Sequence, residues 1–470
     1  MAAVKWTARS YSQVAGANED LRIAVVGCGA MGRAQLAEIR GLTGVRVVGL
    51  CDPDQAMLDR AAAPGRRGRP ETATQFKDVR KVLESREIDA ITVASPNHWH
   101  SLMVIWACQA GKDVYVEKPV CHNLWEGDQA LAARTKYDRI VQAGTQWRSR
   151  AHVFEAFEWV KAGNLGKTLV SRAFCYKRRE SIGKTDGPQP IPPTVDYDLW
   201  CGPSPNNGMH REKLHYDWHW FWENGNGDIG NVCCHHIDLA RWALSKSTVA
   251  PSVIAVGGRM GYVDDGQTPN SLFAVHDYGD CQLIAEVRGL PAAANAGNRM
   301  DQYKGIDLGN VVECENGYVT VNERNAIAFD PAGKEIRRFT GADVTRDRSH
   351  IGNFLRVVRS RKREEQNAEL AEGTASAAIS HLSNISYRLG QTADTRDIAA
   401  QLSKSISGTE TFERLQSHLS ANNIDLARSP LTLGVPLQID PANVRISNQP
   451  ASAALTSDKY RSPFVVPATV

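Results

Sequence analysis

Residues 22–32 read Arg-Ile-Ala-Val-Val-Gly-Cys-Gly-Ala-Met-Gly, an apolar run that leads into a glycine-rich turn. The run predicts a buried β-strand, and the G-x-G-x-x-G spacing is typical of the turn between the first strand and first helix of a dinucleotide-binding domain. Gly27 allows the tight turn, Gly29 lets backbone approach a pyrophosphate, and Gly32 lets the helix pack against the strand. The N–H groups at the start of that helix then point toward the phosphates.

An acidic residue follows at the spacing that such a domain requires. Residues 46–52 read as a second strand that ends in Asp52, 20 residues after Gly32. A carboxylate there binds a ribose 2′-hydroxyl and repels a 2′-phosphate, so NAD is the expected cofactor. Arg33 and the basic loop of residues 66–69 carry the positive charge that could reverse this preference. The alternative is a glycine turn in another α/β fold, which the strand, helix and acid together disfavour.

Length and composition indicate a globular enzyme. A chain of 470 residues is long enough for two domains, and its 42% hydrophobic and 23% charged residues fit that class. A net charge of +3 gives no reason to expect nucleic acid or a membrane as a partner. The ten cysteines lack a C-x-x-C pair, so buried thiols are expected. No signal-peptide pattern occurs in the first 20 residues, but a chain whose leader had been removed would look the same, so the compartment stays open.

Three further motifs follow the glycine turn. Ser95-Pro-Asn-His-Trp-His100 and Glu117-Lys-Pro119 each come after a short apolar strand, and residues 230–238 read Gly-Asn-Val-Cys-Cys-His-His-Ile-Asp. Together with the glycine turn and Asp52, this set resembles the Gfo/Idh/MocA family, which includes glucose–fructose oxidoreductase and inositol dehydrogenase. The resemblance covers residues 21–242 in order and spacing. It implies an α/β fold: a Rossmann dinucleotide-binding domain followed by an α+β domain with a large open mixed sheet.

The chain is accordingly divided into four segments. Strand and helix patterns alternate up to about residue 147, which indicates a parallel sheet. Further strand patterns recur between residues 253 and 321 and would supply the mixed sheet. We expect an N-terminal extension (1–20), the Rossmann domain (21–147), a substrate-binding and oligomerisation domain (148–424) and an extended C-terminal arm (425–470) that packs on the body or on a neighbouring subunit.

Lys118 is the leading candidate for catalysis. It lies where a parallel strand ends, and open α/β sheets bind their ligands at such ends. An ammonium group there can hydrogen-bond a substrate hydroxyl and stabilise an oxyanion as a hydride leaves. The alternative is a surface ion pair with Glu117, which Pro119 disfavours because it fixes the direction of the turn. The resemblance likewise assigns this lysine to catalysis.

The resemblance also makes His235 the catalytic histidine, which takes a hydroxyl proton. A structural role is the alternative for one of the adjacent pair His235 and His236. Four residues before this histidine the dehydrogenase branch usually has aspartate, whereas this chain has Asn231. An amide can orient a hydroxyl group but cannot accept a proton, so the family's Lys–Asp–His relay is in doubt. Tyr216 is a further candidate base.

The remaining site residues follow from motif position and from an aromatic segment. Residues 215–222 read His-Tyr-Asp-Trp-His-Trp-Phe-Trp, which could cover the C–H face of a pyranose or pack in a core. The expected cofactor-binding residues are Gly27, Gly29, Ala30, Met31, Gly32, Asp52, Ser95, Asn97, His100, Glu117, Lys118 and Gln146. The expected substrate-binding residues are Arg148, Trp200, Asp217, Trp218, Trp220 and His236. A metal bound by His215, His219, His235 and His236 is possible, but no carboxylate–histidine signature completes the site, so none is expected.

Three functions remain open. The first is an NAD-dependent oxidoreductase that transfers a hydride between a carbohydrate secondary alcohol and the nicotinamide. The second is redox-neutral, NAD-dependent glycoside cleavage through a transient 3-keto sugar. The third is a non-catalytic NAD-binding regulator, which would have no use for Lys118 or His235. We expect a small-molecule sugar or glycoside as partner, no nucleic acid or membrane, and a homodimer or dimer of dimers that the arm locks together.

Overall fold

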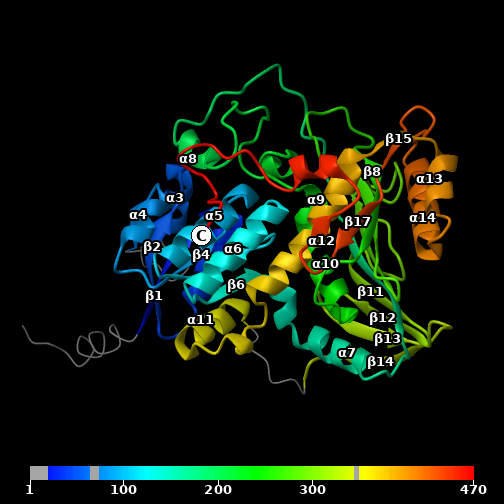
Figure 1. The fold of residues 1–470 in the computed structure, drawn as a ribbon, viewed down its shortest axis with the longest axis horizontal. Coiled ribbons are helices and arrows are strands. Elements are labelled where there is room, and N and C mark those ends of the chain that lie inside the picture. The colour runs from blue at the N-terminus through cyan, green and yellow to red at the C-terminus, as the bar shows by residue number, and fades with distance from the viewer. Residues whose placement is uncertain (1–19, 64–72, 343–348) are drawn as a thin grey trace, which may run out of the picture.

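The computed structural model describes residues 20–63, 73–342 and 349–470. The N-terminal domain is built on a six-stranded parallel sheet in the order β3-β2-β1-β4-β5-β6 (Figure 1). This is the strand order of a dinucleotide-binding Rossmann fold. The strands are β1 (Leu21–Val26), β2 (Val45–Cys51), β3 (Thr74–Phe76), β4 (Ala90–Val93), β5 (Asp113–Glu117) and β6 (Val141–Gly144).

Helices cover both faces of this sheet because alternate side chains of each strand point to opposite faces. Ile23 and Val25 pack with α2 (Ala30–Ile39), α3 (Gln55–Ala62) and α11 (His350–Ser360). Ala24 and Val26 face α4 (Val79–Glu84), α5 (Asn97–Gln109) and α6 (Leu124–Lys136). The helix α11, which we expected in the second domain, therefore completes the core of the first.

The second domain is built on a mixed sheet of twelve strands. The main path runs β14-β13-β12-β11-β7-β10-β9-β8-β16-β15, with β17 beside β8 and β18 beside β17, and β7 and β10 pair in parallel. The strands are β7 (Thr168–Tyr176), β8 (Ser252–Gly258), β9 (Ser271–Asp277), β10 (Gln282–Arg288), β11 (Leu308–Cys314), β12 (Gly317–Val321), β13 (Ala326–Phe329), β14 (Glu335–Phe339), β15 (Gln391–Ala393), β16 (Leu431–Leu433), β17 (Leu437–Asp440) and β18 (Arg445–Ile446).

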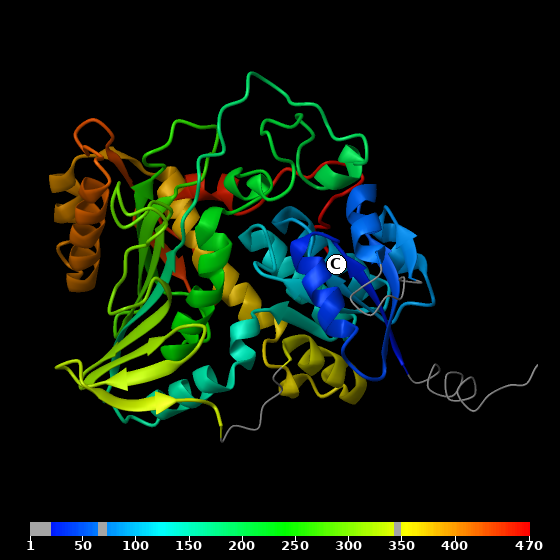
Figure 2. The same ribbon diagram turned by 180° about the vertical axis from the view of Figure 1, so that it is seen from behind.

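Helices cover one face of this sheet fully and the other in part (Figure 2). The inner face packs on α7 (Ala151–Lys161), α10 (Val232–Ala243) and α12 (Leu370–Leu389). The outer face of β8, β9 and β10 packs on α13 (Thr395–Leu402) and α14 (Ile406–Ala421), which also carries Arg414 onto the buried Glu286 at 2.6 Å. The outer face is thus less open than expected.

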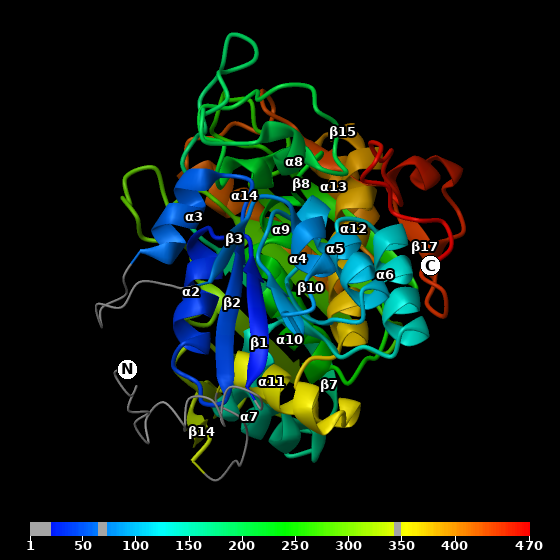
Figure 3. The same ribbon diagram turned by 90° about the vertical axis from the view of Figure 1, so that its left-hand side faces the viewer.

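A long connection between two elements of the second domain also contacts the Rossmann domain. Residues 177–226, here called the roof segment, leave β7 and include the short helix α8 (Tyr197–Cys201) and the 3₁₀ turn η2 (Asp217–Trp220) before α9 (Gly227–Gly230). Figures 1 and 3 show α8 beside α3, on the Rossmann domain, although the chain enters and leaves the roof segment from the second domain.

The C-terminal arm packs on its own chain. Its first part supplies β16, β17 and β18, and η4 (Pro450–Leu455) lies against α12. Its last part crosses to the Rossmann domain (Figure 1). There Phe464 and Val466 are buried with Trp99 and Leu102. We expected the arm to pack on the body or on a neighbouring subunit; in this structure it packs on the body, where it contacts both domains of its own chain.

Two further expectations can be compared directly. The ten cysteines are buried and free, which confirms the prediction of buried thiols. Among the described residues, no helix has the length and apolar character that a bilayer crossing requires.

Candidate active site

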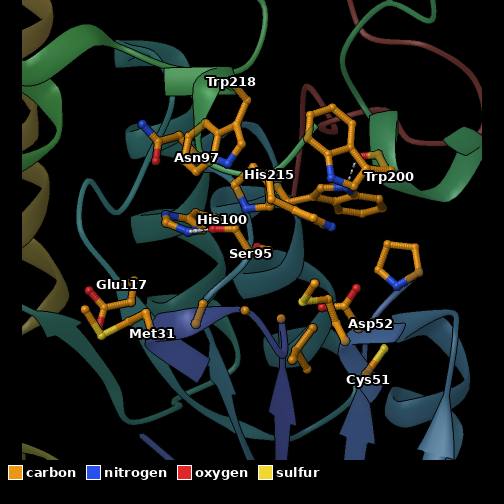
Figure 4. Close-up of a pocket in the computed structure, with 18 of the residues that line it drawn as sticks. Met31, Cys51, Asp52, Ser95, Asn97, His100, Glu117, Trp200, His215 and Trp218 are labelled. Atoms are coloured by element: carbon orange, nitrogen blue, oxygen red, sulfur yellow. Dashed lines mark hydrogen bonds between the residues drawn. The ribbon is translucent and has the colours of Figure 1, made fainter. Parts of the chain in front are cut away.

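A cavity of about 470 Å³ lies at the carboxyl ends of β1, β2, β4 and β5, beneath the roof segment. Figure 4 shows Met31 and Asp52 on the side of the Rossmann sheet, with Trp200, His215 and Trp218 facing them from the roof segment. The volume is in the range of small-molecule and cofactor sites. Of the expected site residues, it brings together Gly27, Gly29, Ala30, Met31, Asp52, Ser95, Asn97, His100, Glu117, Lys118, Trp200, Tyr216, Trp218 and Asn231.

The glycine turn has the shape that a pyrophosphate requires. A Cβ at Gly29 would meet nothing within 4 Å, so open space lies over its backbone. A Cβ at Gly32 would lie 1.7 Å from the Gly27 carbonyl oxygen, which explains why that position must lack one. The first turn of α2 has no acidic residue and no side-chain cap, so its N–H groups are available to an anion. Gly32 itself lies behind the cavity wall and acts through packing.

Asp52 sits beside this turn and is almost fully buried. One carboxylate oxygen accepts a hydrogen bond from the Cys28 backbone N–H at 2.7 Å, and the other accepts one from Asp54 N–H at 2.9 Å. Burial raises the pKa of Asp52 to about 6, although both amides oppose the shift. Arg33, Arg60 and Lys77 line the same end of the cavity. The basic loop of residues 66–69 lies outside the described residues.

The first turn of α5 forms another wall. The Asn97 side-chain amide donates to Asn226 Oδ1 at 3.0 Å, and the Ser95 hydroxyl lies 3.7 Å from the Met103 sulfur. The two ring nitrogens of His100 lie 2.6 Å from the Pro119 carbonyl and 2.8 Å from the Ser95 carbonyl. Burial lowers the pKa of His100 to about 4, so the neutral ring donates to one carbonyl at a time.

Lys118 enters the cavity from the end of β5. Its Nζ donates to Asn231 Oδ1 at 2.9 Å and to the Asn231 carbonyl at 3.1 Å. Burial lowers the pKa of Lys118, while the adjacent Glu117 opposes the shift. The Glu117 carboxylate does not bind Lys118 Nζ; it accepts from Gln35 at 2.9 Å and from Gln146 at 2.8 Å. Gln146 therefore does not reach the cavity, because its amide is engaged in supporting Glu117.

His235 and His236 project from α10 in different directions. Neither lines the cavity. Burial, and next the charge of Lys118, lower the pKa of His235 well below its ordinary value, so its half-buried ring is neutral and close enough to Lys118 to be influenced by it. His236 is buried, with Nδ1 at 3.2 Å from Asn310 Oδ1, and it packs edge-on against Trp147. His236 is thus a core residue, not a substrate ligand.

Arg148 is also placed away from the cavity. Its guanidinium donates to Asp238 at 2.7 Å and lies 3.1 Å from Glu372. Both partners come from helices of the second domain, and the side chain is 7% exposed. The expected role in substrate binding is replaced by an ion pair between η1 (Gln146–Ser149) and helices α10 and α12, because the buried guanidinium needs those carboxylates.

The aromatic segment is divided between the cavity and the core. Trp218 lines the cavity, as does Trp200, whose ring stacks on Tyr197. Trp220 is buried under the Arg179 guanidinium, and the half-buried Asp217 does not line the cavity. The Tyr216 hydroxyl accepts from Arg179 at 2.6 Å.

His219 is a cavity residue that the sequence suggested only as a metal ligand. Its Nδ1 lies 2.5 Å from the Tyr216 carbonyl, so Nδ1 carries the proton and Nε2 has a free lone pair. Burial lowers the pKa of His219 to about 3, which keeps the ring neutral. The ring stacks on Trp218 with a centroid distance of 3.6 Å. In the sequence, the position of His219 between Trp218 and Trp220 is the feature that could have indicated a base lining the cavity.

Within the described residues, the side chains that lie close enough together to hold a metal ion include none of the four histidines considered above. His122, Glu126 and Asp458 have ligand atoms within 4.8 Å of one another. These groups already pair with each other: His122 Nδ1 lies 2.8 Å from Asp458, and Glu126 accepts from the His122 backbone. The cluster joins the Rossmann domain to the C-terminal arm.

Family models match both domains. Residues 21–145 match the NAD-binding Rossmann fold of the GFO_IDH_MocA oxidoreductase family, and residues 159–299 match the C-terminal α/β domain of the same family. The order of the two matches agrees with the order of the two sheets.

Curated relatives match mainly through the first domain. Inositol 2-dehydrogenase 4 of Saccharopolyspora erythraea is 31% identical over 166 residues, which cover 35% of this chain and 47% of the relative. A glycosyl hydrolase family 109 protein of a Shewanella species is 30% identical over 159 residues, 33% of this chain and 34% of the relative. The chain thus spans about half the length, or less, of these relatives.

Solved structures share the fold over most of the chain. The WlbA dehydrogenase of Bordetella pertussis, solved with NADH and UDP-GlcNAcA, superposes with a TM-score of 0.56 at 18% identity, over 78% of this chain and 94% of that one. At this identity the likeness concerns the fold alone.

Proposed function

Since the chain belongs to the Gfo/Idh/MocA family of oxidoreductases, whose N-terminal domain binds NAD, we propose that it oxidises a secondary alcohol of a carbohydrate or polyol. The observation that carries this proposal is the position of Lys118 Nζ, which shares one cavity with the glycine turn and Asp52. Bound at that turn, NAD⁺ would supply a hydride acceptor.

Lys118 has the donors that the reacting oxygen needs. An ammonium group has three N–H bonds, and Asn231 takes two of them. The third is available to a substrate hydroxyl. Because burial lowers the pKa of Lys118, its proton is held less tightly, which suits a group that shares a proton with a developing oxyanion. Asn231 fixes the direction of Nζ without the charge that an aspartate would add.

His235 is proposed to take the hydroxyl proton. The alcohol loses a hydride from carbon and a proton from oxygen, and the neutral imidazole of His235, which lies one turn along α10 from the cavity-lining Asn231, can accept the proton. His235 lies close enough to Lys118 for that charge to lower its pKa. The substrate is neutral in this proposal, because Lys118 is already engaged and Arg179 is neutralised by Asp228 at 2.5 Å.

Replacing Lys118 tests the mechanism. Lys118→Ala should lower turnover by about a hundredfold or more while NAD affinity changes little, because the ammonium acts on the substrate oxygen. Isothermal titration with NAD and a panel of sugars and polyols read for NADH would measure both effects. A Lys118→Ala variant with wild-type turnover would exclude this mechanism.

A second candidate is redox-neutral glycoside cleavage. His219 favours it, because its free Nε2 gives the cavity a neutral base, whereas His235 does not line the cavity. Transient oxidation of a sugar at carbon 3 acidifies the carbon 2 hydrogen; a base removes that proton, the aglycone departs, water adds and the ketone is reduced again. Aryl glycosides incubated with catalytic NAD distinguish the two: aglycone release without net NADH supports cleavage, and NADH without aglycone supports the dehydrogenase.

We also propose a homodimer through the uncovered part of the mixed sheet. Helices α13 and α14 cover the outer face of β8, β9 and β10, whereas β12 to β14 present the stacked rings of Tyr318 and Phe329 and the half-exposed Ile336. Such apolar sheet faces commonly pair between subunits. Light scattering at micromolar concentration should give a dimer that Ile336→Glu weakens; a monomer would contradict the proposal.

A further inference from the structure

A second cavity, of about 290 Å³, lies where the roof segment, α5, α6, the end of α12 and the C-terminal arm meet. We call it the junction cavity, and we call the cavity that contains Lys118 the reaction cavity. Within the described part of the chain, no residue lines both. The volume of the junction cavity is near the lower end of the range for small-molecule sites, so it admits a ligand of monosaccharide size and not a dinucleotide.

Arg388 supplies a cation to this cavity from the last turn of α12. Its guanidinium lies over the Trp222 ring, 4.8 Å from the ring centre, and it makes no hydrogen bond or ion pair with the described residues. Burial lowers the pKa of Arg388, and the charge of Asp458 opposes the shift. Arg461, on the nearby arm, has the usual partner of such a group, since it donates to Asp198 Oδ1 at 2.5 Å. The N–H groups of Arg388 are therefore available to a ligand.

Lys459 adds a second cation from the C-terminal arm. It is exposed and lines the same cavity, and no described residue hydrogen-bonds or ion-pairs with it. Two cations at one cavity repel each other, whereas an anion between them would be attracted to both. Guanidinium and ammonium groups are the side chains that bind carboxylate and phosphate oxygens in proteins. The pair thus has the chemistry of an anion site.

Two of the three acids that line the cavity are already bound within the chain. Asp458 Oδ2 lies 2.8 Å from His122 Nδ1 and accepts from the Asn123 side chain at 2.8 Å. Glu126 accepts from the His122 backbone N–H at 2.8 Å and from the Tyr460 hydroxyl at 3.3 Å. These bonds tie the arm to the Rossmann domain and leave the two cations without a carboxylate partner.

The third acid, Glu223, gives the cavity a free acceptor. Its carboxylate follows Trp222 in the chain, is half-buried, and makes no hydrogen bond within the part of the chain that the structure describes. Burial raises the pKa of Glu223, and Arg211 opposes the shift. A carboxylate can only accept hydrogen bonds when ionised, so its natural ligand partner is a hydroxyl group.

The junction cavity also adjoins the wall of the reaction cavity. His98 lines the first and Trp99 the second, and the two residues are adjacent on α5. Both contact the Trp200 carbonyl, which lies 3.1 Å from His98 Nε2 and accepts from Trp99 Nε1 at 3.1 Å. An occupant of the junction cavity would therefore lie outside the reaction cavity but against the same stretch of α5.

From these groups we propose that the junction cavity binds a small hydroxylated anion, a sugar acid or a sugar phosphate. Its charged group lies between Arg388 and Lys459, and one of its hydroxyl groups donates to Glu223. The inference goes beyond the proposed function, because it concerns a separate site and requires no hydride transfer.

The test measures binding and needs no turnover. Glucuronate, glucose 6-phosphate and glucose are titrated calorimetrically into protein saturated with NAD⁺, which keeps the phosphate ester away from the glycine turn. We expect the wild type to bind at least one of the anions with a dissociation constant of about 1 mM or lower, and roughly tenfold more tightly than glucose. The anion that binds more tightly identifies the charged group as carboxylate or phosphate.

Two variants remove the proposed contacts. Arg388→Gln should weaken binding of the anion by about tenfold or more, and Lys459→Gln by about threefold, with no change for glucose. Arg396→Gln is the matched control, because this exposed arginine pairs with Asp394 at 3.4 Å and does not line the cavity. It loses the same charge and should bind the anion as the wild type does. Circular dichroism checks the fold of each variant, and Lys459→Gln decides the proposal if Arg388→Gln misfolds.

Three results would overturn the inference. The first is a wild type that binds neither anion at concentrations up to about 10 mM. The second is equal binding of the anion by the control and by the folded cavity variants. The third is loss of anion binding in Lys118→Ala, which would place the anion in the reaction cavity. An inactive enzyme that binds the anion through Arg388 would refute the proposed function alone.

Discussion

Gly29 and Gly32 lie three residues apart but serve different purposes. Gly29 faces open space in a backbone conformation that alanine also adopts, whereas Gly32 packs against the Gly27 carbonyl. We therefore expect Gly29→Ala to lower NAD affinity about tenfold or more with little change in melting temperature, because the new methyl group occupies the phosphate site.

Gly32→Ala, in contrast, should mainly lower the stability of the fold. A Cβ 1.7 Å from a carbonyl oxygen forces the α2 helix away from β1, so we expect a loss of about 2–4 kcal/mol in the free energy of unfolding. Thermal melts and NAD titrations of the two variants, side by side, check both expectations. Equal effects of the two substitutions on stability would contradict the division of roles.

Asp52 should make NAD binding depend on pH. Its pKa is about 6, and the ionised carboxylate is the form that accepts ribose hydroxyl groups. As pH falls through 6, the group is protonated and the dissociation constant should rise by up to about tenfold per pH unit. Titration calorimetry from pH 5 to 8 measures this slope, and Asp52→Asn should show weak binding without it. A wild-type profile flat across pH 6 would show that Asp52 does not bind the ribose as an anion.

How much of the site the sequence reveals depends on how local its contacts are. Gly27, Asp52 and Lys118 are found from motif spacing because one strand and the turn after it determine their positions. Arg148 and His236 were placed wrongly because their partners Glu372 and Asn310 come from distant elements. A short-range pattern contains no information about those pairings.

Helices and strands were likewise predictable where the local sequence determines them. The patterns predicted β1 and β2 and the short strands β4 and β5 that precede the Ser95 and Glu117 motifs, since each is a buried apolar run of ordinary length. They missed β3, which has three residues and no buried side chain, and they missed α13 and α14, which cover the sheet through only a few apolar positions. The attachment of the roof segment to the Rossmann domain uses several backbone carbonyls, including those of Thr194, Pro53 and Trp200, which leave no trace in the sequence.

Phe464 should be the main anchor of the C-terminal arm. It is 1% exposed, its ring lies 5.4 Å from Trp99 edge-on, and the Arg80 and Arg461 guanidiniums each lie 5.1 Å from its centre. Phe464→Ala should cost about 3–5 kcal/mol in the free energy of unfolding, as buried aromatic truncations do. Val465, which is 47% exposed, provides the control, and Val465→Ala should cost less than about 0.5 kcal/mol in the same denaturation experiment. Equal losses in the free energy of unfolding for the two variants would show that Phe464 is not the anchor of the arm.

At the scale of the whole molecule, the His122–Asp458 pair should make the attachment of the arm depend on pH. Although burial acts to lower it, the Asp458 carboxylate raises the pKa of His122, and the pKa of Asp458 falls to about 2. A histidine with a raised pKa stabilises the fold fully below its ordinary value of about 6.5, and this stability is lost as pH rises through the raised value.

The melting temperature of Asp458→Asn should thus fall below that of the wild type by more at pH 6 than at pH 9. The pKa of Glu126, in the same cluster, is raised by burial to about 7, so comparing variant and wild type at each pH isolates the ion pair. Differential scanning calorimetry over pH 5.5–9 gives both series. If the difference in melting temperature between wild type and Asp458→Asn grew with pH, the His122–Asp458 ion pair would not be what stabilises the attachment of the arm.

The burial of Phe464 in the Rossmann core also constrains how the protein can be made. Domains generally fold in the order in which the ribosome produces them, at about 5–20 residues per second. The last strand of the sheet, β6, ends at Gly144. Phe464, which completes this core, is therefore translated roughly 15–60 s after the sheet. During that interval Trp99 and Trp106 lack their partner, and a nascent first domain would present an apolar surface to chaperones. Early ribosomal release of a truncated chain should therefore yield an aggregation-prone product and not a small, independent nucleotide-binding protein.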